Sequence, residues 1–389
     1  MKIGIYGGSF NPPHKGHENA AEAAIAALGL DKLLVIPAGD PPHKQLAENT
    51  PTDTHRYNMA KLAFTDIDKC EVSDYELKEE GPSYTINTIR HFKEVYPDDE
   101  IYLLMGTDMF ITLDAWFEGV NIMRECYVVA FARNDGEMET IKAKRDEFLS
   151  KYGEDSIILD LPVTSCASSD VRRLLPCRLG CDYISDAVYW YIIRNRLYGA
   201  KPDFAWLRRK SHPMHKPKRV PHVIGCEEEA VRLALRWGAD VENARTAGIL
   251  HDITKICGLD EQLQLCRNYG IMTDTLESQS EKLLHSKTGA ATAREIFGVN
   301  SEVFSAIYWH TTGKADMTLL EKVLYLADYV EPNRDFEGVD ELRRLCYTDI
   351  DDAMRLGLEM SVDDLNERGV PIHKNTFEAL QFYKHQSKN

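Results

Sequence analysis

Hydrophobic and polar positions follow one pattern in the first half of the chain and another in the second. Up to about residue 200, short apolar runs that predict buried strands occur at residues 2–6, 33–36, 102–105, 127–131 and 157–159. Helical patterns lie between them, for example at residues 54–64 and 84–95. This alternation predicts a parallel sheet with helices on both faces. Ligands of such sheets bind at the carboxyl ends of the strands.

Strand signals nearly vanish beyond residue 205, and apolar residues recur at helical spacing. One stripe consists of Val223, Cys226, Ala230, Leu233, Ala234 and Trp237, and others lie at residues 244–249 and 319–330. The pattern predicts an all-helical domain of five or more helices. We therefore predict two domains, residues 1–200 and 205–389, joined near Pro202. We interpret the basic residues at 208–219 as a linker and a solvated helix edge.

A glycine-rich loop follows the first predicted strand. It contains Gly8 and leads through His14 into an alanine-rich helix that carries His17. Glycine lets the backbone turn sharply and approach a ligand, and a helix N-terminus offers free N–H groups to an anion. Two histidines three residues apart can reach one bound group. The stretch therefore predicts a phosphate-binding site.

Later strands are followed by further candidate binding residues. They are Lys44 in a proline-stiffened loop, Asp108 just past a buried strand, Trp116 as a core residue or an aromatic platform, and Ser168, Ser169 and Arg172 at a helix start. Hydroxyls and an arginine at a helix start favour an anion. Ser83 is a predicted helix N-cap. These positions fall at the carboxyl ends of the predicted strands, where such sheets bind their ligands.

The opening motif resembles that of the H-x-G-H nucleotidyltransferases, and residues 36–38, 42–44, 81–85, 105–108, 116 and 191–198 resemble the NadD family of nicotinate-nucleotide adenylyltransferases. The resemblance covers residues 2 to about 198. It implies a Rossmann-like α/β fold and, with Mg²⁺, transfer of AMP from ATP to nicotinate mononucleotide. The products would be deamido-NAD and pyrophosphate. Transfer to another acceptor, such as phosphopantetheine, is the alternative.

This resemblance also implies a role for each matching residue. His14 and His17 would be catalytic and stabilise charge on the phosphates. The ATP phosphates would be held by Gly8, Ser9 and Phe10, and the departing pyrophosphate by Ser168, Ser169 and Arg172. The mononucleotide phosphate would meet Lys44. The nicotinate would be surrounded by Tyr84, Thr85 and Trp116, and the adenosine would lie at Gly106 and Asp108. The family often has Ile-Ser ahead of its Ser-Thr ending, where this chain has Cys166 and Ala167.

The helical half carries a set of histidines and aspartates. Its members are His222, His251, Asp252, His285, His310 and Asp328. Asp328 lies within an apolar segment, where a carboxylate is costly to bury without a partner or a metal. Imidazole and carboxylate ligands together suit a divalent transition metal such as Fe or Mn. The set therefore predicts a metal site.

Residues 247–255 resemble the core motif of the HD phosphohydrolases, and residues 219 to about 383 resemble the YqeK family. This resemblance implies symmetrical hydrolysis of diadenosine tetraphosphate to two ADP. His222, His251, Asp252 and Asp328 would be metal ligands, and His285 and His310 would complete a dinuclear iron site. Lys255, expected to be catalytic, and Arg334 would neutralise substrate phosphates. The alternatives are another nucleotide phosphoester, such as guanosine tetraphosphate or a cyclic nucleotide, and a regulatory nucleotide-binding module.

Composition narrows the classes of partner. The net charge of −16 over 389 residues argues against a general nucleic-acid binder. Nine scattered cysteines without a C-x-x-C pair predict reduced thiols and a cytoplasmic protein. No apolar run approaches the ~20 residues of a membrane span, and no signal peptide is expected. We expect a bifunctional enzyme without nucleic-acid or membrane partners; its association into homo-oligomers stays open.

Overall fold

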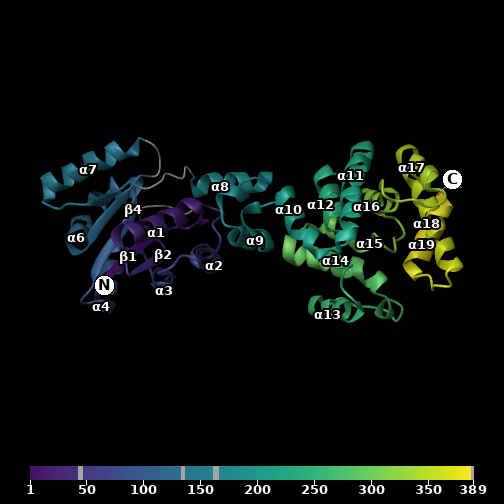
Figure 1. Cartoon of the computed structure of the whole chain (residues 1–389), viewed down its shortest axis with the longest axis horizontal. Coiled ribbons are helices and arrows are strands. Elements are labelled where there is room, and N and C mark those ends of the chain that lie inside the picture. Colours follow the sequence, from purple (N-terminus) through teal and green to yellow (C-terminus); the bar gives the residue numbers. More distant parts are fainter. Residues whose placement is uncertain (43–46, 133–135, 161–165, 387–389) are drawn as a thin grey trace. The chain divides into compact units, whose positions relative to one another are not determined.

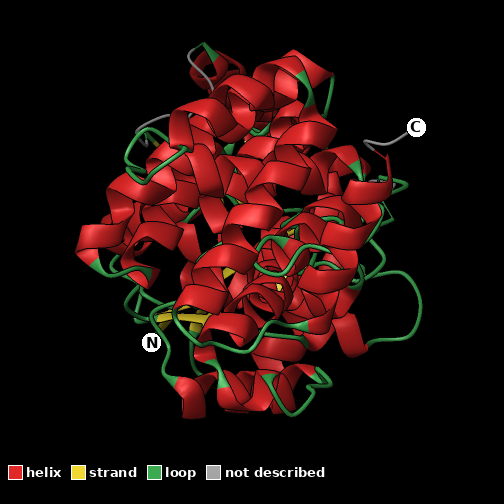
Figure 2. Ribbon diagram, turned by 90° about the vertical axis from the view of Figure 1, so that its right-hand side faces the viewer, coloured by secondary structure: helices red, strands yellow, loops and turns green. Residues whose placement is uncertain are grey.

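The chain forms two compact units, Met1–Lys201 and Pro202–Asn389, in a computed structural model (Figure 1). The structure describes residues 1–42, 47–132, 136–160 and 166–386. Among these residues, strands occur in the first unit, and the second unit is built from helices (Figure 1). Figure 2 shows helices in red and strands in yellow. The predicted change from an α/β pattern to an all-helical pattern is therefore confirmed.

The sheet of the first unit has six parallel strands in the order β3-β2-β1-β4-β5-β6. Their bounds are β1 Lys2–Gly8, β2 Lys32–Pro37, β3 Cys70–Val72, β4 Glu100–Gly106, β5 Tyr127–Phe131 and β6 Ile157–Leu159. The strand order reverses at β1, which pairs with both β2 and β4. Ligands of open parallel sheets bind in the crevice at such a point. The sequence pattern missed β3, which is short and not continuously apolar.

Helices cover both faces of the sheet (Figure 1). They are α1 (Lys15–Leu28), α2 (Asp53–Phe64), α3 (Tyr75–Lys78), α4 (Thr85–Val95), α5 (Thr107–Phe110), α6 (Gly119–Glu125), α7 (Glu137–Tyr152), α8 (Ser168–Leu174) and α9 (Asp186–Arg194). Ile5 and Leu103 point into a core shared with α4, α6 and α7. Helices α1 and α2 contact β2. This layering leaves the carboxyl ends of β1, β2 and β4 for the loops that carry the motifs.

The second unit consists of helices joined by short segments. They are α10 (Phe204–Ser211), α11 (Val220–Trp237), α12 (Val241–Leu250), α13 (Leu259–Tyr269), α14 (Glu281–Phe297), α15 (Ser301–Trp309), α16 (Leu319–Val330), α17 (Val339–Thr348), α18 (Ile350–Glu367) and α19 (Lys374–Gln386). The predicted stripe on α11 is buried apart from its last residue, Trp237, which stays partly accessible. A Cβ at Gly248 on α12 would lie 2.7 Å from the Cα of Glu227 on α11. Glycine therefore lets these two helices approach closely.

The interpretation of residues 208–219 as a solvated edge is wrong for two arginines. Arg208 donates through Nε to the buried Glu227 over 2.8 Å, and Arg245 bonds the same carboxylate over 2.9 Å. Arg219 donates to Asp252. An acidic partner buried elsewhere in the helical unit decided each position, and a local pattern does not reveal such a partner.

Two features bear on partners and redox chemistry. The nine cysteines are all free thiols, and Cys226, Cys266 and Cys346 are buried. Of the helices within the described ranges, none has the length and apolar character to cross a membrane.

Candidate active sites

The glycine-rich loop at the end of β1 folds around a buried aromatic ring. The ring of Phe10 lies beneath Gly8, where a Cβ would be 3.2 Å from the ring. Phe10 is 1% exposed and packs against His17 with a centroid distance of 5.1 Å. Its side chain thus supports the histidine, and its backbone remains for the implied contact with ATP.

The structure brings His14 and His17 together at the start of α1. His14 is the N-cap residue, and its backbone N–H donates to His17 Nδ1 over 3.2 Å. The two ring centroids are 3.7 Å apart. Because Nδ1 of His17 accepts a hydrogen bond, the neutral ring carries its proton on Nε2. An N–H donor beside a helix N-terminus is suited to a phosphate oxygen.

Residues far along the chain hold the same loop. The hydroxyl of Ser168 on α8 donates to the carbonyl of Pro12 over 2.8 Å, and Arg172 donates to the carbonyl of Asn11. Tyr198 donates to the side-chain oxygen of Asn11 over 2.8 Å. Ser169 is exposed beside them. Three residues of the predicted pyrophosphate clamp are therefore at or near the glycine-rich loop.

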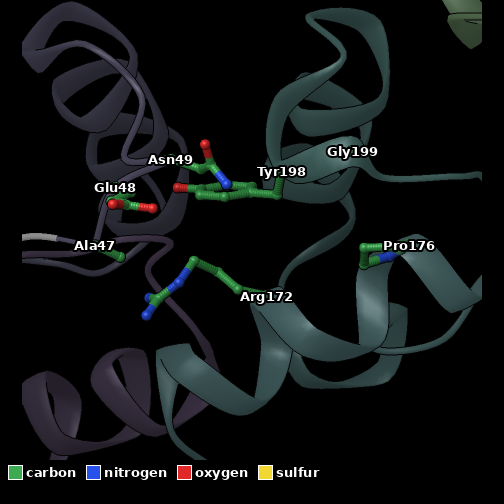
Figure 3. A pocket seen from close by; sticks show the side chains of 7 residues that line it. All are labelled: Ala47, Glu48, Asn49, Arg172, Pro176, Tyr198 and Gly199. Atoms are coloured by element: carbon green, nitrogen blue, oxygen red, sulfur yellow. The ribbon is translucent and has the colours of Figure 1, made fainter.

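A cavity of about 540 Å³ adjoins this region (Figure 3). Arg172 and Tyr198 line it together with Ala47, Glu48, Asn49, Pro176 and Gly199. In Figure 3 the guanidinium of Arg172 points toward the side of the cavity formed by residues 47–48. Lys44, predicted to meet the mononucleotide phosphate, lies outside the described residues.

Arg56 on α2 is a further candidate that the sequence did not reveal. Its side chain is fully buried, donates to the carbonyl of Ser9 over 3.2 Å and pairs with Asp53. A buried arginine that contacts a glycine-rich loop fixes the path of the backbone there. An arginine within a helix is usually solvated, so no local signal distinguishes this one.

The two loops that follow β2 and precede α4 pair with each other. The backbone N–H of Asp40 donates to the Ser83 hydroxyl over 3.1 Å, and Ser83 N–H donates to the Asp40 carbonyl over 2.8 Å. The prediction of Ser83 as the N-cap is therefore wrong, because α4 begins at Thr85 with Tyr84 as its cap residue. Beneath these loops, burial raises the pKa of Glu76 to about 7, against the opposing effect of its 2.7 Å bond from Thr88.

Aromatic side chains lie next to the start of α4. The rings of Tyr84 and Phe117 are 4.5 Å apart, and Phe117 is 52% exposed. Trp116 is largely buried, and its indole N–H donates to Thr112 over 3.1 Å. Phe117 is a candidate ring contact that sequence reasoning passed over in favour of its neighbour. At the end of β4, Gly106 caps α5 and Asp108 is exposed.

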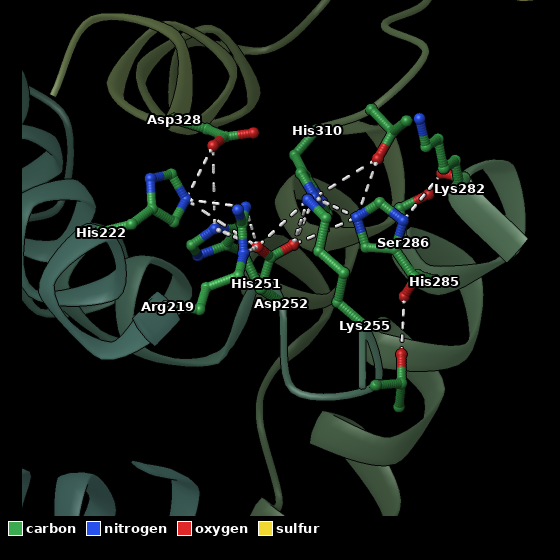
Figure 4. Close-up of polar contacts among 12 residues, drawn as sticks. Arg219, His222, His251, Asp252, Lys255, Lys282, His285, Ser286, His310 and Asp328 are labelled. Atoms are coloured by element: carbon green, nitrogen blue, oxygen red, sulfur yellow. Dashed lines mark hydrogen bonds and ion pairs between the residues drawn. The ribbon is translucent and has the colours of Figure 1, made fainter. Parts of the chain in front are cut away.

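In the helical unit, the six predicted metal ligands converge (Figure 4). His222 comes from α11, His285 from α14 and Asp328 from α16, while His251 with Asp252 and His310 directly follow α12 and α15. They form two triads, His222–His251–Asp328 and Asp252–His285–His310, in each of which the ligand atoms lie within 4.8 Å of one another.

Asp252 belongs to the second triad and also faces the histidines of the first. Its Oδ1 is 3.1 Å from His285 Nε2 and 3.6 Å from His310 Nε2. Its Oδ2 is 3.4 Å from His251 Nε2 and 3.8 Å from His222 Nε2. Each carboxylate oxygen of Asp252 thus faces the histidines of a different triad.

All four imidazoles present Nε2 to this centre because Nδ1 is engaged elsewhere. In three of them Nδ1 donates to a backbone carbonyl: His251 to Gly248 (2.8 Å), His285 to Lys282 (2.7 Å) and His310 to Ile307 (2.6 Å). In the fourth, Nδ1 of His222 donates to the Glu331 carboxylate (3.0 Å). Nε2 of His251 is buried and finds no hydrogen-bond partner in the described part of the chain. Oriented imidazole lone pairs with two carboxylates fit a divalent transition metal.

Protonation in the metal-free protein suits the same role at His285, His310 and Asp252. Burial opposes ionisation of His251, but Cys226 and Asp252 raise its pKa well above the ordinary range, so this ring must lose a proton before it binds a metal. Burial lowers the pKa of His285 to about 4 and also lowers that of His310, so both rings are neutral near pH 7. Burial opposes ionisation of Asp252, but His251 and Lys255 hold its pKa well below the ordinary range. Neutral imidazoles and ionised carboxylates are the forms that bind metal.

Three cations surround the carboxylates of the centre. Lys255 Nζ lies 3.1 Å from Asp252, and Arg334 donates to Asp328 over 2.7 Å. Arg219 contacts Asp252 and lies 3.0 Å from His222 Nε2. Helix α12 ends at Leu250, so Lys255 approaches from the turn that follows it. Arg219 was missed, although it stands three residues before His222.

A third group of metal-like residues, Asp274, Glu277 and His373, has a different chemistry. His373 Nδ1 accepts the backbone N–H of Asn375, so Nε2 carries the proton and donates toward Asp274 (3.2 Å) and Glu277 (3.3 Å). Lys287 already pairs with Glu277 over 2.6 Å. The group is therefore a polar clamp that ties the segment before α19 to the loop after α13.

Comparison with known proteins assigns the two halves separately. Residues 5–174 match the cytidylyltransferase-like family, and residues 219–333 match the HD domain. The first half is 38% identical to the "probable nicotinate-nucleotide adenylyltransferase" of Clostridium tetani over 173 residues, which is 44% of this chain and 86% of that protein. It is 36% identical to the enzyme of the same name from Clostridium botulinum strain Kyoto, over 50% of this chain and 97% of that protein.

Two solved structures are also similar. One is a "predicted HD superfamily hydrolase involved in NAD metabolism" from Clostridium acetobutylicum, with 32% identity, a TM-score of 0.47 and coverage of 48% of this chain and 100% of that one. The other is the nicotinic acid mononucleotide adenylyltransferase of Plasmodium falciparum complexed with NaAD, with 23% identity, a TM-score of 0.43 and coverage of 52% and 98%. From the sequence relatives and the family matches, the first half of the chain belongs to the nicotinate-nucleotide adenylyltransferase family, and the second half carries an HD domain.

Proposed function

We propose that the chain is a bifunctional enzyme. The first unit transfers AMP from ATP to nicotinate mononucleotide, a step of NAD biosynthesis, and the second unit is a metal-dependent phosphohydrolase. The observation that carries the first proposal is the pairing of His14 with His17 at the start of α1, in a chain that belongs to this enzyme family. The observation that carries the second is the pair of triads, in which Asp252 of one triad also lies 3.4 Å from His251 of the other.

In the first reaction, a phosphate oxygen of the mononucleotide attacks the α-phosphorus of ATP. The bond from this oxygen to phosphorus forms, the bond to the bridging oxygen breaks, and pyrophosphate leaves. His17 donates from Nε2, with His14 beside it, to oxygens on which charge develops. Ser168 and Arg172 lie next to the same loop, where they meet the departing pyrophosphate. Mg²⁺ would neutralise charge on the phosphates when bound.

The acceptor site follows from the start of α4. Thr85 is the first residue of this helix, whose N-terminus favours a carboxylate, and the Tyr84–Phe117 pair and Trp116 offer aromatic surface. Gly106 and Asp108 would lie at the adenosine, and Lys44 would meet the acceptor phosphate. We therefore expect nicotinate mononucleotide to be preferred over its neutral amide analogue.

The test is release of pyrophosphate by the full chain from ATP with nicotinate mononucleotide, nicotinamide mononucleotide or phosphopantetheine. The expected kcat/KM is roughly tenfold or more higher for the nicotinate acceptor, because a binding site that satisfies a carboxylate loses those hydrogen bonds with the amide. Equal values for both mononucleotides would contradict the assigned acceptor site. Turnover with phosphopantetheine alone would contradict the assigned activity.

For the second unit we propose a dinuclear centre, with iron as the ion. His222, His251 and Asp328 would hold one ion and His285 and His310 the other, with Asp252 between them. When bound, the ions supply Lewis-acid activation of a phosphoryl group and of water. Lys255, Arg334 and Arg219 pair with the carboxylates in the metal-free chain. With Asp252 and Asp328 engaged as metal ligands, these three cations would be available to substrate phosphates.

Three cations around one centre fit a substrate with several phosphates, and we propose diadenosine tetraphosphate, cleaved symmetrically. The test is a product assay on iron-loaded full chain. Two ADP for each substrate would support the proposal. AMP with ATP would contradict the symmetrical cleavage. Turnover only of guanosine tetraphosphate or a cyclic nucleotide would assign another substrate, and no turnover with metal bound would favour a regulatory module.

A further inference from the structure

We propose that Glu331 is a positioning residue that holds His222 in the metal centre and strengthens binding of the ion at the His222–His251–Asp328 triad. The inference rests on the proposed metal-dependent function. Glu331 directly follows α16, three residues after Asp328, and is 1% exposed. A buried carboxylate is costly unless its oxygens are satisfied, and both oxygens of this one are engaged.

The two oxygens have different partners. Oε1 accepts from His222 Nδ1 over 3.0 Å. Oε2 accepts from the backbone N–H of Asn333 over 2.7 Å and from its side-chain amide over 2.8 Å. The same amide also donates to the carbonyl of Pro221, next to His222, over 3.1 Å. Asn333 therefore fixes the carboxylate in the orientation that faces the imidazole.

Gly225 provides the space for this carboxylate on α11. A Cβ at Gly225 would lie 2.3 Å from Oε2 of Glu331 and 3.0 Å from Nδ2 of Asn333. Gly225 lies within α11, three residues after His222, where glycine lowers helix stability. Close approach of Glu331 gives a physical reason for glycine at this position.

His222 differs from the other three histidines in its outer partner. His251, His285 and His310 each donate to the backbone carbonyl three residues earlier, a local and neutral partner. His222 donates to a carboxylate 109 residues away. An anionic partner makes an imidazole a better electron donor, and loss of such partners typically weakens metal binding 10–100-fold. The His222 triad thus depends on Glu331 in a way that the other triad does not.

The experiment is a stepwise titration of the full chain with Mn²⁺, followed by calorimetry and by electron paramagnetic resonance, which separates a coupled pair of ions from a single ion. Wild-type protein is expected to bind two ions. Glu331→Gln retains the shape and an acceptor for His222 but removes the charge. We expect one binding step to weaken about 10–100-fold and the other to stay unchanged, with a single-ion spectrum at intermediate Mn²⁺.

Glu229→Gln is the matched control. Glu229 is also buried on α11, but it accepts from Tyr347 over 2.7 Å and pairs with Arg232. This substitution is expected to change stability and to leave both metal affinities as in wild type. Gly225→Ala provides a second route, since its methyl group would displace Glu331. Introduced into wild type, Gly225→Ala should weaken the same metal-binding step as Glu331→Gln does. Introduced into Glu331→Gln protein, it should weaken that step little further, because both substitutions remove the same interaction.

The outcomes separate this inference from the function beneath it. If folded Glu331→Gln protein binds both Mn²⁺ ions with the affinities of wild type, the proposed role of Glu331 is overturned and the metal centre is unaffected. Equal weakening of both steps would also overturn it, since the inference assigns Glu331 to one triad. Wild-type protein that binds no transition metal would overturn the metal-dependent function itself.

Discussion

At the scale of the residue, one hydrogen bond decides what a histidine offers to a ligand. His17 accepts at Nδ1 from the backbone of His14, which leaves a proton on Nε2. His285 and His310 donate from Nδ1 to backbone carbonyls, which leaves a lone pair on Nε2. The first form can donate to a phosphate oxygen, and the second can bind a metal. The same side chain therefore offers a donor in one unit and an acceptor in the other.

His17→Ala removes the donor at the start of α1. We expect adenylyl transfer to fall about 10²–10³-fold, because a preorganised donor to developing charge is lost, while phosphohydrolase activity stays unchanged. Pyrophosphate release and ADP formation measure the two. His55→Ala, on α2 and bonded to Tyr191 over 2.8 Å, is the control and should retain most of the transfer. Equal loss of both activities in His17→Ala would contradict separate sites.

Glu76→Gln tests the buried carboxyl beneath the acceptor loops. Burial raises the pKa of Glu76 to about 7, so folding favours its protonated form. That stabilising contribution is present at low pH and is lost as the pH rises through about 7. Gln stays neutral at every pH. We therefore expect the free energy of unfolding of the variant, measured relative to that of wild type, to increase by up to about 3 kcal/mol from pH 5 to pH 8. The free energy of unfolding is measured by urea unfolding of the full chain, followed by hydrogen exchange in residues 1–201. If the stabilities of variant and wild type change with pH in parallel, the raised pKa of Glu76 is refuted.

At the scale of the element, helix ends carry much of the chemistry. His14 precedes α1, while His251 and His310 follow α12 and α15. A side chain at a helix end is placed by the packing of the whole helix, so close contact between helices becomes part of the site. The approach of α12 to α11 at Gly248 is the clearest case.

Gly248→Ala should push α12 away from α11. The added methyl would lie 2.7 Å from the Glu227 backbone, so we expect a loss of about 1–3 kcal/mol in the free energy of unfolding and weaker metal binding, since His251 moves relative to His222. Gly357→Ala in α18 is the control, because its methyl would meet only ordinary contacts at 3.8–3.9 Å. It should be neutral or stabilising. Thermal unfolding of the helical unit, residues 202–389, within the full chain compares Gly248→Ala with Gly357→Ala. Equal losses of stability in the two variants would refute the packing argument.

At the scale of the whole molecule, each unit has its own core and its own set of chemical groups. The groups proposed for adenylyl transfer all lie in Met1–Lys201, and those proposed for hydrolysis all lie in Pro202–Asn389. The two activities should therefore be separable by mutation and by metal.

His251→Ala is expected to abolish hydrolysis and to spare adenylyl transfer. Added Mn²⁺ or Fe²⁺ should stabilise residues 202–389 of wild type by about 3 kcal/mol at a concentration one hundred times Kd, and should have little effect on the variant. Thermal unfolding with and without metal, read separately for the two units, measures this. Metal stabilisation of the variant equal to that of wild type would place the ion elsewhere.

The sequence predicted the regular elements and the local motifs well where one period or one short pattern dominates. The strands at residues 127–131 and 157–159 and the helix at 319–330 agree with the structure to the residue. Prediction failed for side chains whose hydrogen-bond partners lie far away in the sequence. Ser83 bonds the Asp40 loop and does not cap α4, and Arg208 and Arg219 are held by buried carboxylates.

By itself the sequence determined the division into an α/β half and a helical half, and it determined which residues can do chemistry. Both follow from local order, because apolar periodicity decides which faces are buried and motif spacing decides which groups share a turn. Only the tertiary structure decided that Arg56 contacts Ser9, that Glu331 accepts a hydrogen bond from His222 and that Asp252 faces the histidines of both triads. A buried polar group must find a partner, and that partner is whichever group the packing of distant segments brings within reach.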